Sequence, residues 1–128
     1  MGDLRKILHV EDDPDIREIA YLALAELGGF EVLQCASGME AIEKAEAFLP
    51  DVFLLDMMMP GMTGVETIVA IRAQTSLVEV PAIFMTSKNI ATEHQDEIRT
   101  LAVGAIQKPF DPVALPDQIR SMVAKSAT

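Results

Sequence analysis

Short runs of consecutive apolar residues alternate with longer amphipathic stretches along the whole chain. A short apolar run that ends at turn residues is typical of a strand buried on both faces of a parallel sheet. Between these runs, apolar residues recur three or four positions apart, which is the spacing of a helix that buries one side. The pattern predicts strands over residues 4–10, 31–35, 52–55, 80–85 and 104–107.

The stretches between the strands carry start and stop signals for helices. Asp13 and Pro14 are typical of the N-cap and first turn of a helix, which is expected to end at Gly28. The segments Ser37 to Glu40 and Thr63 to Glu66 both match the capping box, in which each side chain accepts a bond from the other residue's backbone amide. The first helix is expected to bury Ile16, Ile19, Ala20, Ala23, Leu24 and Leu27.

The last two helices differ in how much apolar surface they offer. Residues 89–102 are mostly polar, so we expect a weakly packed, adjustable helix there, for which Thr92 is a candidate N-cap. Asp111 followed by Pro112 predicts the start of the final helix. The residues expected to be buried are Ile98, Leu101 and Ala102 in the first of these helices and Leu115, Ile119, Met122 and Val123 in the second.

The order of the predicted elements defines the fold class. Strands that alternate with helices five times over predict an α/β protein with a parallel sheet, covered on both faces and joined by right-handed crossovers. The length of 128 residues suits one domain with a substantial core. No stretch resembles an interdomain linker, so we expect a single domain over residues 1–128.

Composition narrows the classes of partner. The formal net charge of −10 disfavours nucleic acid, which needs a basic surface, and favours cations or basic protein surfaces. No apolar run approaches the roughly 18 residues of a membrane span, so no membrane is expected as a partner. The single cysteine, Cys35, lies in a predicted strand and is more often a buried apolar residue than a reactive thiol. A cytoplasmic location is therefore expected.

Polar side chains stand at the carboxyl ends of four of the predicted strands. Because these ends share one edge of a parallel sheet, and ligands bind outside that edge in open α/β folds, the side chains are expected to converge on one pocket. They are Glu11 and Asp12 after the first strand, Asp56 after the third, Thr86 after the fourth and Lys108 after the fifth.

Clustered carboxylates predict a cation and a phosphoryl group at this pocket. Like charges repel, and a hard cation such as Mg²⁺, which prefers a few carboxylates and accepts phosphate oxygens, relieves the repulsion. Asp56 can then act as a carboxylate nucleophile towards a phosphoryl donor. Lys108 would offset charge on the phosphoryl oxygens, and the Thr86 hydroxyl could bond another oxygen.

Each of these residues also has a plain structural explanation. Glu11 and Asp12 could be acids at the start of a helix, and Asp56 could cap the next helix. Thr86 could form a turn at the end of its strand, and Lys108 could be one more solvated lysine. These explanations do not account for complementary groups at the end of each of these strands, which favours the functional interpretation.

The set of motifs resembles the CheY-like receiver domain of two-component response regulators, over essentially the whole chain. Any one motif is weak, whereas all four in this order on a (βα)₅ pattern are highly specific. The resemblance implies a flavodoxin-like, doubly wound fold with a five-stranded parallel sheet in the order 2-1-3-4-5. The motifs that carry it are Val10 to Pro14, Leu55 to Gly64, Met85 to Ser87 and Lys108 to Phe110.

The resemblance also implies roles for individual residues. It implies that Asp56 accepts a phosphoryl group from a sensor histidine kinase or a histidine phosphotransfer protein. It implies Mg²⁺ held by Asp12, Asp56, the backbone carbonyl of Met58 and, through water, Glu11. It further implies that Thr86 is the switch hydroxyl, that Lys108 contacts the phosphoryl oxygens, and that the Lys108–Pro109 bond is cis.

Three positions depart from the family pattern. Glu11 stands where the family often has aspartate, and its longer arm still suits a contact through water. Ala105 stands where the family often has an aromatic switch residue, so a rotating aromatic ring cannot carry the signal. Met58 and Lys88 stand where the family often has groups that position the hydrolytic water, so we expect them to shield the phosphoryl group and slow its loss.

Signalling by protein contact is the output that the resemblance implies. The expected surface comprises the fourth helix, the fifth strand and the fifth helix, and it includes His94, Ala105, Gln107 and Gln118. We expect a signalling module whose only chemistry is its own phosphorylation and dephosphorylation, rather than a turnover enzyme.

Other functions stay open at this point. One alternative is a phosphotransferase acting on an outside substrate, although Met58 occupies the place of the usual second acid. Another is a binding module that works without phosphorylation, although no phosphate-cradling glycine motif is present. The chain could also be the receiver fragment of a larger regulator or hybrid kinase.

Overall fold

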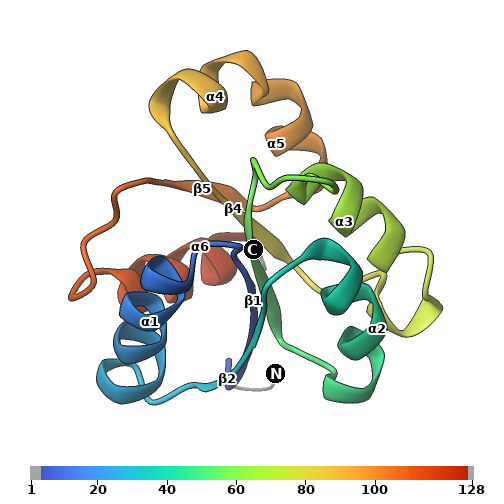
Figure 1. The fold of residues 1–128 in the computed structure, drawn as a ribbon. Helices are drawn as coiled ribbons and strands as arrows, with labels where there is room; N and C mark the ends of the chain where they lie inside the picture. The colour runs from blue at the N-terminus through green and yellow to red at the C-terminus, as the bar shows by residue number, and fades with distance from the viewer. Residues whose placement is uncertain (1–3, 127–128) are drawn as a thin grey trace.

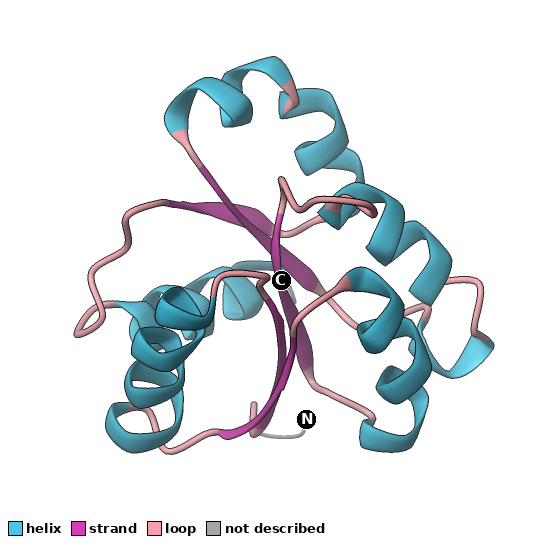
Figure 2. Cartoon of the chain, viewed as in Figure 1, coloured by secondary structure: helices cyan, strands magenta, loops and turns pink. Residues whose placement is uncertain are grey.

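A computed structural model describes residues 4–126 and shows one central sheet between helices (Figures 1 and 2). The sheet has five parallel strands in the order β2-β1-β3-β4-β5, as the resemblance implied. Its centre is β3, whose residues are all buried. The strands are β1 (Lys6–Val10), β2 (Glu31–Cys35), β3 (Val52–Asp56), β4 (Ala82–Thr86) and β5 (Gly104–Gln107).

Sequence and structure agree on all five strands; the bounds of β2 and β5 are as predicted, and those of β1, β3 and β4 differ by one or two residues. The fourth strand begins two residues later than predicted, at Ala82, and its last residue is Thr86. Pro81 lacks an amide proton and contributes only its carbonyl, which accepts a bond from the Phe53 amide at 2.9 Å. Asp56 is the last residue of β3 itself, so its side chain is held by the sheet and not by a loop.

The helices lie in two layers on opposite faces of the sheet (Figure 1). Helices α1 (Pro14–Tyr21) and α6 (Leu115–Ser126) cover one face, where the core centres on Leu24, Leu54 and Ile83. Helices α2 (Gly38–Phe48) and α3 (Gly64–Ile71) cover the other face, and α5 (Gln95–Leu101) packs beside α3. The remaining helical segments are η1 (Leu22–Leu27), η2 (Thr75–Leu77) and α4 (Lys88–Glu93).

The first helix departs from the predicted regular pattern. It continues from α1 into η1, a π-helical segment that inserts extra backbone into the turn. Ala20, Ala23 and Leu24 are buried as predicted, but Ile19 and Leu27 are 47% and 63% exposed. The prediction that these two residues face the core was therefore wrong. Leu27 lies at the end of the π-helical segment, which shifts it from the position it would have in a regular helix, whereas Ile19 lies on the exposed side of α1 itself.

One of the two predicted capping boxes is complete. Thr63 and Glu66 satisfy each other's backbone amides, as predicted. Ser37 accepts a bond from the Glu40 amide at 3.2 Å, but the Glu40 carboxylate takes the Ala36 amide at 2.7 Å. The Glu40 carboxylate thus accepts from the residue before the N-cap, and not from the N-cap Ser37 itself as a capping box requires.

The predicted fourth helix is broken in two at His94. The backbone of His94 lies outside the helical region, and neither α4 nor α5 has a fully buried residue, which agrees with the weak packing expected here. Ser87, not Thr92, is the N-cap of α4. Thr92 instead donates to the Lys88 carbonyl at 3.0 Å.

The final helix also begins later than predicted. Asp111 holds a turn by accepting from the Val113 amide at 3.0 Å, and α6 starts at Leu115. Leu115 and Ile119 are buried, and Met122 and Val123 pack at the edge of the same core. In the part of the chain that the structure describes, no helix has both the length and the apolar character needed to cross a bilayer.

Candidate functional site

The register of the sheet brings the polar strand ends together. Val10 pairs with Leu55, Asp56 with Met85, and Thr86 with Gln107, so the ends of β1, β3, β4 and β5 lie next to one another. Glu11, Asp56 and Thr86 are almost fully buried, at 1%, 5% and 3% exposure, whereas Asp12 is exposed. The structure thus places the predicted site residues around one edge of the sheet.

Lys108 is the central cation of this cluster. Its Nζ lies 3.0 Å from Glu11 Oε1 and 3.2 Å from Asp56 Oδ2, and its backbone amide donates to the Thr86 carbonyl at 2.9 Å. The peptide bond that follows it, Lys108–Pro109, is cis, as predicted. One ammonium therefore joins two buried carboxylates that come from different strands.

The charges in the cluster are incompletely balanced. Burial raises the pKa of Glu11 to about 7, and the negative charge of Asp56 adds to the rise, although the bond from Lys108 opposes it. Burial acts to lower the pKa of Lys108, but its bond with Glu11 and the charge of Asp56 outweigh that effect, and the pKa is raised. One lysine is thus held charged beside carboxylates that it cannot fully neutralise.

The acidic residues are arranged to receive a cation. One carboxylate oxygen from each of Glu11, Asp12 and Asp56 lies within 4.8 Å of the other two. Three carboxylates against one ammonium leave negative charge in excess, and oxygen donors of this kind are those that Mg²⁺ prefers. The donor set therefore fits a hard divalent cation, and the exposed Asp12 gives access from solvent.

A cavity of about 250 Å³ opens beside Asp56. Thr86 lines it, and the Thr86 hydroxyl makes one long bond, to the Ser87 carbonyl at 3.3 Å, so it can turn at small cost. Met58 lines the same cavity with a side chain that is 52% exposed, and its amide donates to Asp56 Oδ1 at 3.3 Å. The full lining is Asp56, Met58, Thr86, Ser87, Ile90 and Lys108.

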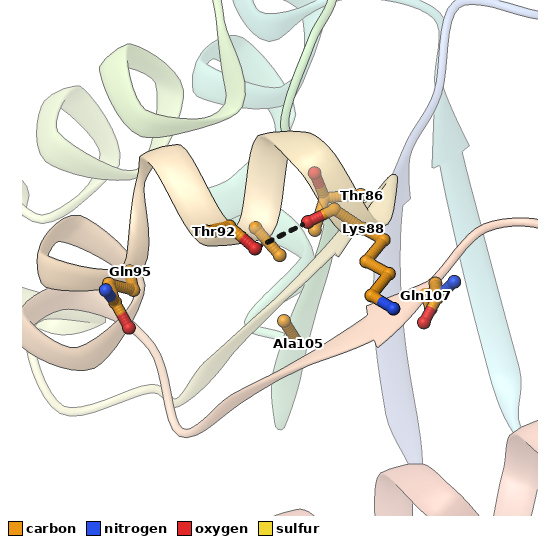
Figure 3. Close-up of a pocket in the computed structure, with 7 residues that line it drawn as sticks. Thr86, Lys88, Thr92, Gln95, Ala105 and Gln107 are labelled. Atoms are coloured by element: carbon orange, nitrogen blue, oxygen red, sulfur yellow. Dashed lines mark hydrogen bonds between the residues drawn. The ribbon is translucent and has the colours of Figure 1, made fainter.

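Of the two residues expected to shield this cavity, only Met58 lines it. Lys88, the first residue of α4, lines a neighbouring cavity instead (Figure 3). Met58 therefore borders the space beside Asp56, whereas Lys88 is not among the residues that line it.

Further hydrogen bonds, which sequence analysis missed, hold the backbone of Glu11 and Asp12. We call these two residues, which follow β1, the acidic loop. Arg17 Nη1 donates to the carbonyls of Glu11 and Asp12, at 2.8 and 3.1 Å. Gln34 Nε2 in turn donates to the Arg17 carbonyl at 2.8 Å and lies 3.1 Å from Nδ1 of His9. Arg17 stands one helical turn after the N-cap Asp13, and that spacing is the signal from which its position over the loop could have been inferred.

His9 is a polar residue in the middle of a buried strand. Burial lowers the pKa of His9 to about 3, with smaller contributions from the charges of Lys108 and Arg17, so the ring is neutral at pH 7. Since the Gln34 nitrogen is a donor, His9 Nδ1 must accept and its Nε2 carries the proton. Within residues 4–126, Nε2 has no hydrogen-bond partner.

Comparison with known proteins shows which proteins this chain is similar to. The family model for the response regulator receiver domain matches residues 7–120 of this chain, a range that includes every residue of the site. Among solved structures, the chemotaxis protein CheY4 of Vibrio cholerae superposes with a TM-score of 0.86 at 32% identity, covering 94% of this chain and 99% of that one.

The curated relatives are longer than the region in which they match this chain. The transcriptional regulatory protein CseB of Streptomyces coelicolor is 36% identical over 128 residues, which is 98% of this chain and 52% of that protein. The phosphate regulon transcriptional regulatory protein PhoB of Escherichia coli is 32% identical over 94% of this chain and 52% of its own length. The chain thus spans about half the length of these relatives, and it belongs to the response regulator receiver domain family.

Proposed function

We propose that Asp56 accepts a phosphoryl group and that the phosphorylated domain signals by protein contact. The observation that carries this proposal is the position of Lys108, which bonds Glu11 and Asp56 at once at the edge of the cavity that Thr86 lines. A nucleophilic carboxylate, a fixed cation and a weakly bonded hydroxyl surround one space of about 250 Å³. That is the positioning and charge stabilisation on which phosphoryl transfer depends.

The reaction follows from these positions. An oxygen of the Asp56 carboxylate attacks the phosphorus of a phosphohistidine, a new P–O bond forms, and the P–N bond breaks. The leaving imidazole nitrogen takes the electron pair of that bond and is protonated from solvent. Lys108 stays beside the phosphoryl oxygens and offsets their charge, and the Thr86 hydroxyl turns to donate to one of them.

A divalent cation belongs to the proposal because the donors fit one. Glu11, Asp12, Asp56 and the backbone carbonyl of Met58 would hold Mg²⁺, with Glu11 acting through water. When bound, the ion supplies charge neutralisation for the phosphoryl oxygens. The bonds from Arg17 keep the backbone of Glu11 and Asp12 in place for this purpose.

The phosphoryl donor in this proposal is a sensor histidine kinase or a histidine phosphotransfer protein. Phosphorylation then biases an existing conformational equilibrium, and a downstream protein binds the favoured state. The thinly packed segment α4–α5, which follows Thr86 directly, is the element that this equilibrium is expected to move.

The proposal is tested by intact-protein mass spectrometry after incubation with Mg²⁺ and acetyl phosphate. We expect the mass of one phosphoryl group to be gained, only when Mg²⁺ is present, and no gain in the Asp56→Asn variant. No gain by the unaltered protein, with Mg²⁺ binding shown separately by calorimetry, would favour a binding module that works without phosphorylation.

Replacing Met58 by asparagine is expected to shorten the lifetime of the phosphorylated state on the order of tenfold. The Met58 side chain borders the Asp56 cavity, and an amide there can orient a water molecule for attack on phosphorus. The decay of phosphorylated protein after removal of acetyl phosphate measures this lifetime. Met39→Asn, at a position that is also exposed but lies on α2, is the matched control, and equal decay of the two variants would contradict the shielding role.

Replacing Arg17 by alanine is expected to weaken Mg²⁺ binding about tenfold, the usual cost of losing a group that orients metal ligands. The variant loses both bonds to the carbonyls of Glu11 and Asp12. Calorimetric titration with Mg²⁺ measures the affinity, and Arg99→Ala, which removes an exposed arginine 3.8 Å from Asp96, is the control. An unchanged Mg²⁺ affinity in Arg17→Ala would show that the acidic loop holds its shape without this contact.

A further inference from the structure

A further cavity, of about 480 Å³, lies at the edge of the sheet opposite to Asp56. Its walls come from the residues that lead into β4 and β5 and from the C-terminal ends of α5 and α6. Because β4 and β5 run parallel, their amino ends share this edge, and the full length of β4 separates the cavity from Thr86. We call this space the Arg72 cavity, after the one cationic residue in its lining.

The guanidinium of Arg72 is held in a fixed position at the wall of this cavity. Arg72 is the C-cap residue of α3, and its side chain is half-buried. Its Nη1 donates to the Leu101 carbonyl at 2.6 Å, and its Nη2 donates to the Val80 carbonyl at 3.2 Å. These two bonds join the end of α5 to the segment before β4, so the cation is oriented before any ligand arrives.

The positive charge of Arg72 has no counter-ion within the described residues 4–126. No carboxylate there lies within 4.0 Å of its nitrogens, and its Nε is buried without a hydrogen-bond partner. Burial lowers the pKa of Arg72, and no neighbouring acid opposes that effect. Withdrawing a charge from water without a partner costs free energy, and a carboxylate is the anion that matches the planar guanidinium. The cavity therefore offers a place for the carboxylate of a ligand.

Glu79 supplies the opposite charge at the rim of the same cavity. It is the second charged residue in the lining, its side chain is exposed, and it makes no ion pair in the part of the chain that the structure describes. Arg72 and Glu79 lie more than 4.0 Å apart, so they do not neutralise each other. The net charge of −10 disfavours a ligand with an overall negative charge. A zwitterion, with one carboxylate and one ammonium, satisfies both groups and carries no net charge.

Most of the remaining lining is apolar and firmly packed. Val80 and Leu101 pack against one core of the domain, and Val103 and Val123 pack against the other. Val78 leaves 47% of its surface exposed at the rim, where a ligand could cover it. The volume of about 480 Å³ lies within the range of about 300–1,000 Å³ that is usual for small-molecule sites. The ligand is therefore expected to have a hydrocarbon body.

We infer that the Arg72 cavity binds a free α-amino acid with an apolar side chain. The carboxylate of the ligand pairs with the N–H groups of Arg72 that the two carbonyls leave unused, and its ammonium pairs with Glu79. The hydrocarbon side chain packs on Val103 and Val123. This site goes beyond the proposed function, because it shares no lining residue with the Asp56 cavity and its occupation does not require phosphorylation.

The test is calorimetric titration of the full chain with leucine, isoleucine, valine, methionine and phenylalanine, each at millimolar concentration. Two analogues examine the charges separately, since leucinamide lacks the carboxylate and 4-methylpentanoate lacks the ammonium. Amide shifts in nuclear magnetic resonance spectra of ¹⁵N-labelled protein locate the binding, and we expect the largest shifts at Leu101, Ala102 and Val103. No acetyl phosphate or Mg²⁺ is added.

Two variants assign the charged groups. Glu79→Gln removes the anion at an exposed position, so the fold should be unaffected, whereas Arg72→Lys keeps the charge but loses the planar pair of donors. We expect each variant to bind the tightest of the five amino acids roughly tenfold more weakly, the usual cost of losing a bond to a charged group. Glu26→Gln, at an exposed position on η1, is the matched control and should bind as the unaltered chain does.

Four results would overturn the inference. They are no binding of any of the five amino acids, equal binding of leucinamide, unchanged affinity in Glu79→Gln, and amide shifts confined to residues away from the cavity. If Arg72→Lys failed to fold, Glu79→Gln and the two analogues would still decide the question. Failure of Asp56 to take up a phosphoryl group would bear on the proposed function alone, since amino-acid binding is measured on the unphosphorylated chain.

Discussion

Replacing Lys108 by alanine is expected to slow the phosphorylation of Asp56 by about 100-fold while tightening the binding of Mg²⁺ about tenfold. The lysine is the fixed cation for the phosphoryl oxygens, so its loss removes charge stabilisation of the transition state. The same ammonium lies 3.0 Å from Glu11 and 3.2 Å from Asp56, where it repels an incoming cation. The two effects therefore have opposite signs.

The rate of mass gain with acetyl phosphate and calorimetric titration with Mg²⁺ measure the two effects. Lys108→Arg is the matched variant, because it keeps the positive charge but not the compact ammonium. It should bind Mg²⁺ nearly as weakly as the unaltered protein and still be phosphorylated slowly. If Lys108→Ala lost both phosphorylation and Mg²⁺ binding, the lysine would be holding the site together rather than serving the reaction.

Replacing Gly64 by alanine is expected to slow phosphorylation roughly tenfold and to destabilise the fold by about 1–3 kcal/mol, the usual cost of overpacking. A Cβ at Gly64 would lie 2.5 Å from the backbone oxygen of Asp56 and 3.0 Å from the Cα of Met57. Neither backbone atom can move without shifting the end of β3. The carboxylate of Asp56 would then be displaced from Lys108.

Gly61→Ala is the control for Gly64→Ala, because Gly61 has a positive φ of 80° with nothing within 4 Å of the added methyl group. It should also lower the free energy of unfolding, by about 1–2 kcal/mol, because the left-handed backbone disfavours alanine. Urea unfolding and the rate of mass gain are measured for both. If both variants were phosphorylated at the same rate, the close approach of Gly64 to Asp56 would have no part in positioning the nucleophile.

The sheet and the positions of the site residues could be predicted because they depend on short-range patterns. Apolar runs such as residues 52–55 define buried strands, and parallel strands place Glu11, Asp56 and Thr86 at one edge whatever lies between them. The connection of Lys108 to Glu11 spans 97 residues, so it could be predicted only through the fold and never from spacing alone.

The features that sequence analysis missed depend on tertiary packing. The π-helical segment Leu22–Leu27 leaves Leu27 exposed, although the apolar spacing resembles that of a regular helix. The break at His94 divides a segment whose polar composition gave no boundary. The contact of Arg17 with the acidic loop requires the path of α1 over the sheet edge, and the unpaired Nε2 of His9 becomes visible only when the ring is packed against its neighbours.

The most direct test of the central claim is to locate the phosphoryl group on the chain. The protein is phosphorylated with acetyl phosphate and Mg²⁺, reduced with borohydride, which converts an aspartyl phosphate into homoserine, and digested for peptide mass spectrometry. We expect homoserine at position 56 and aspartate at positions 12, 13 and 51. Homoserine at one of the other positions, or at none in protein that gained the mass of a phosphoryl group, would contradict the assignment of Asp56 as the phosphoacceptor.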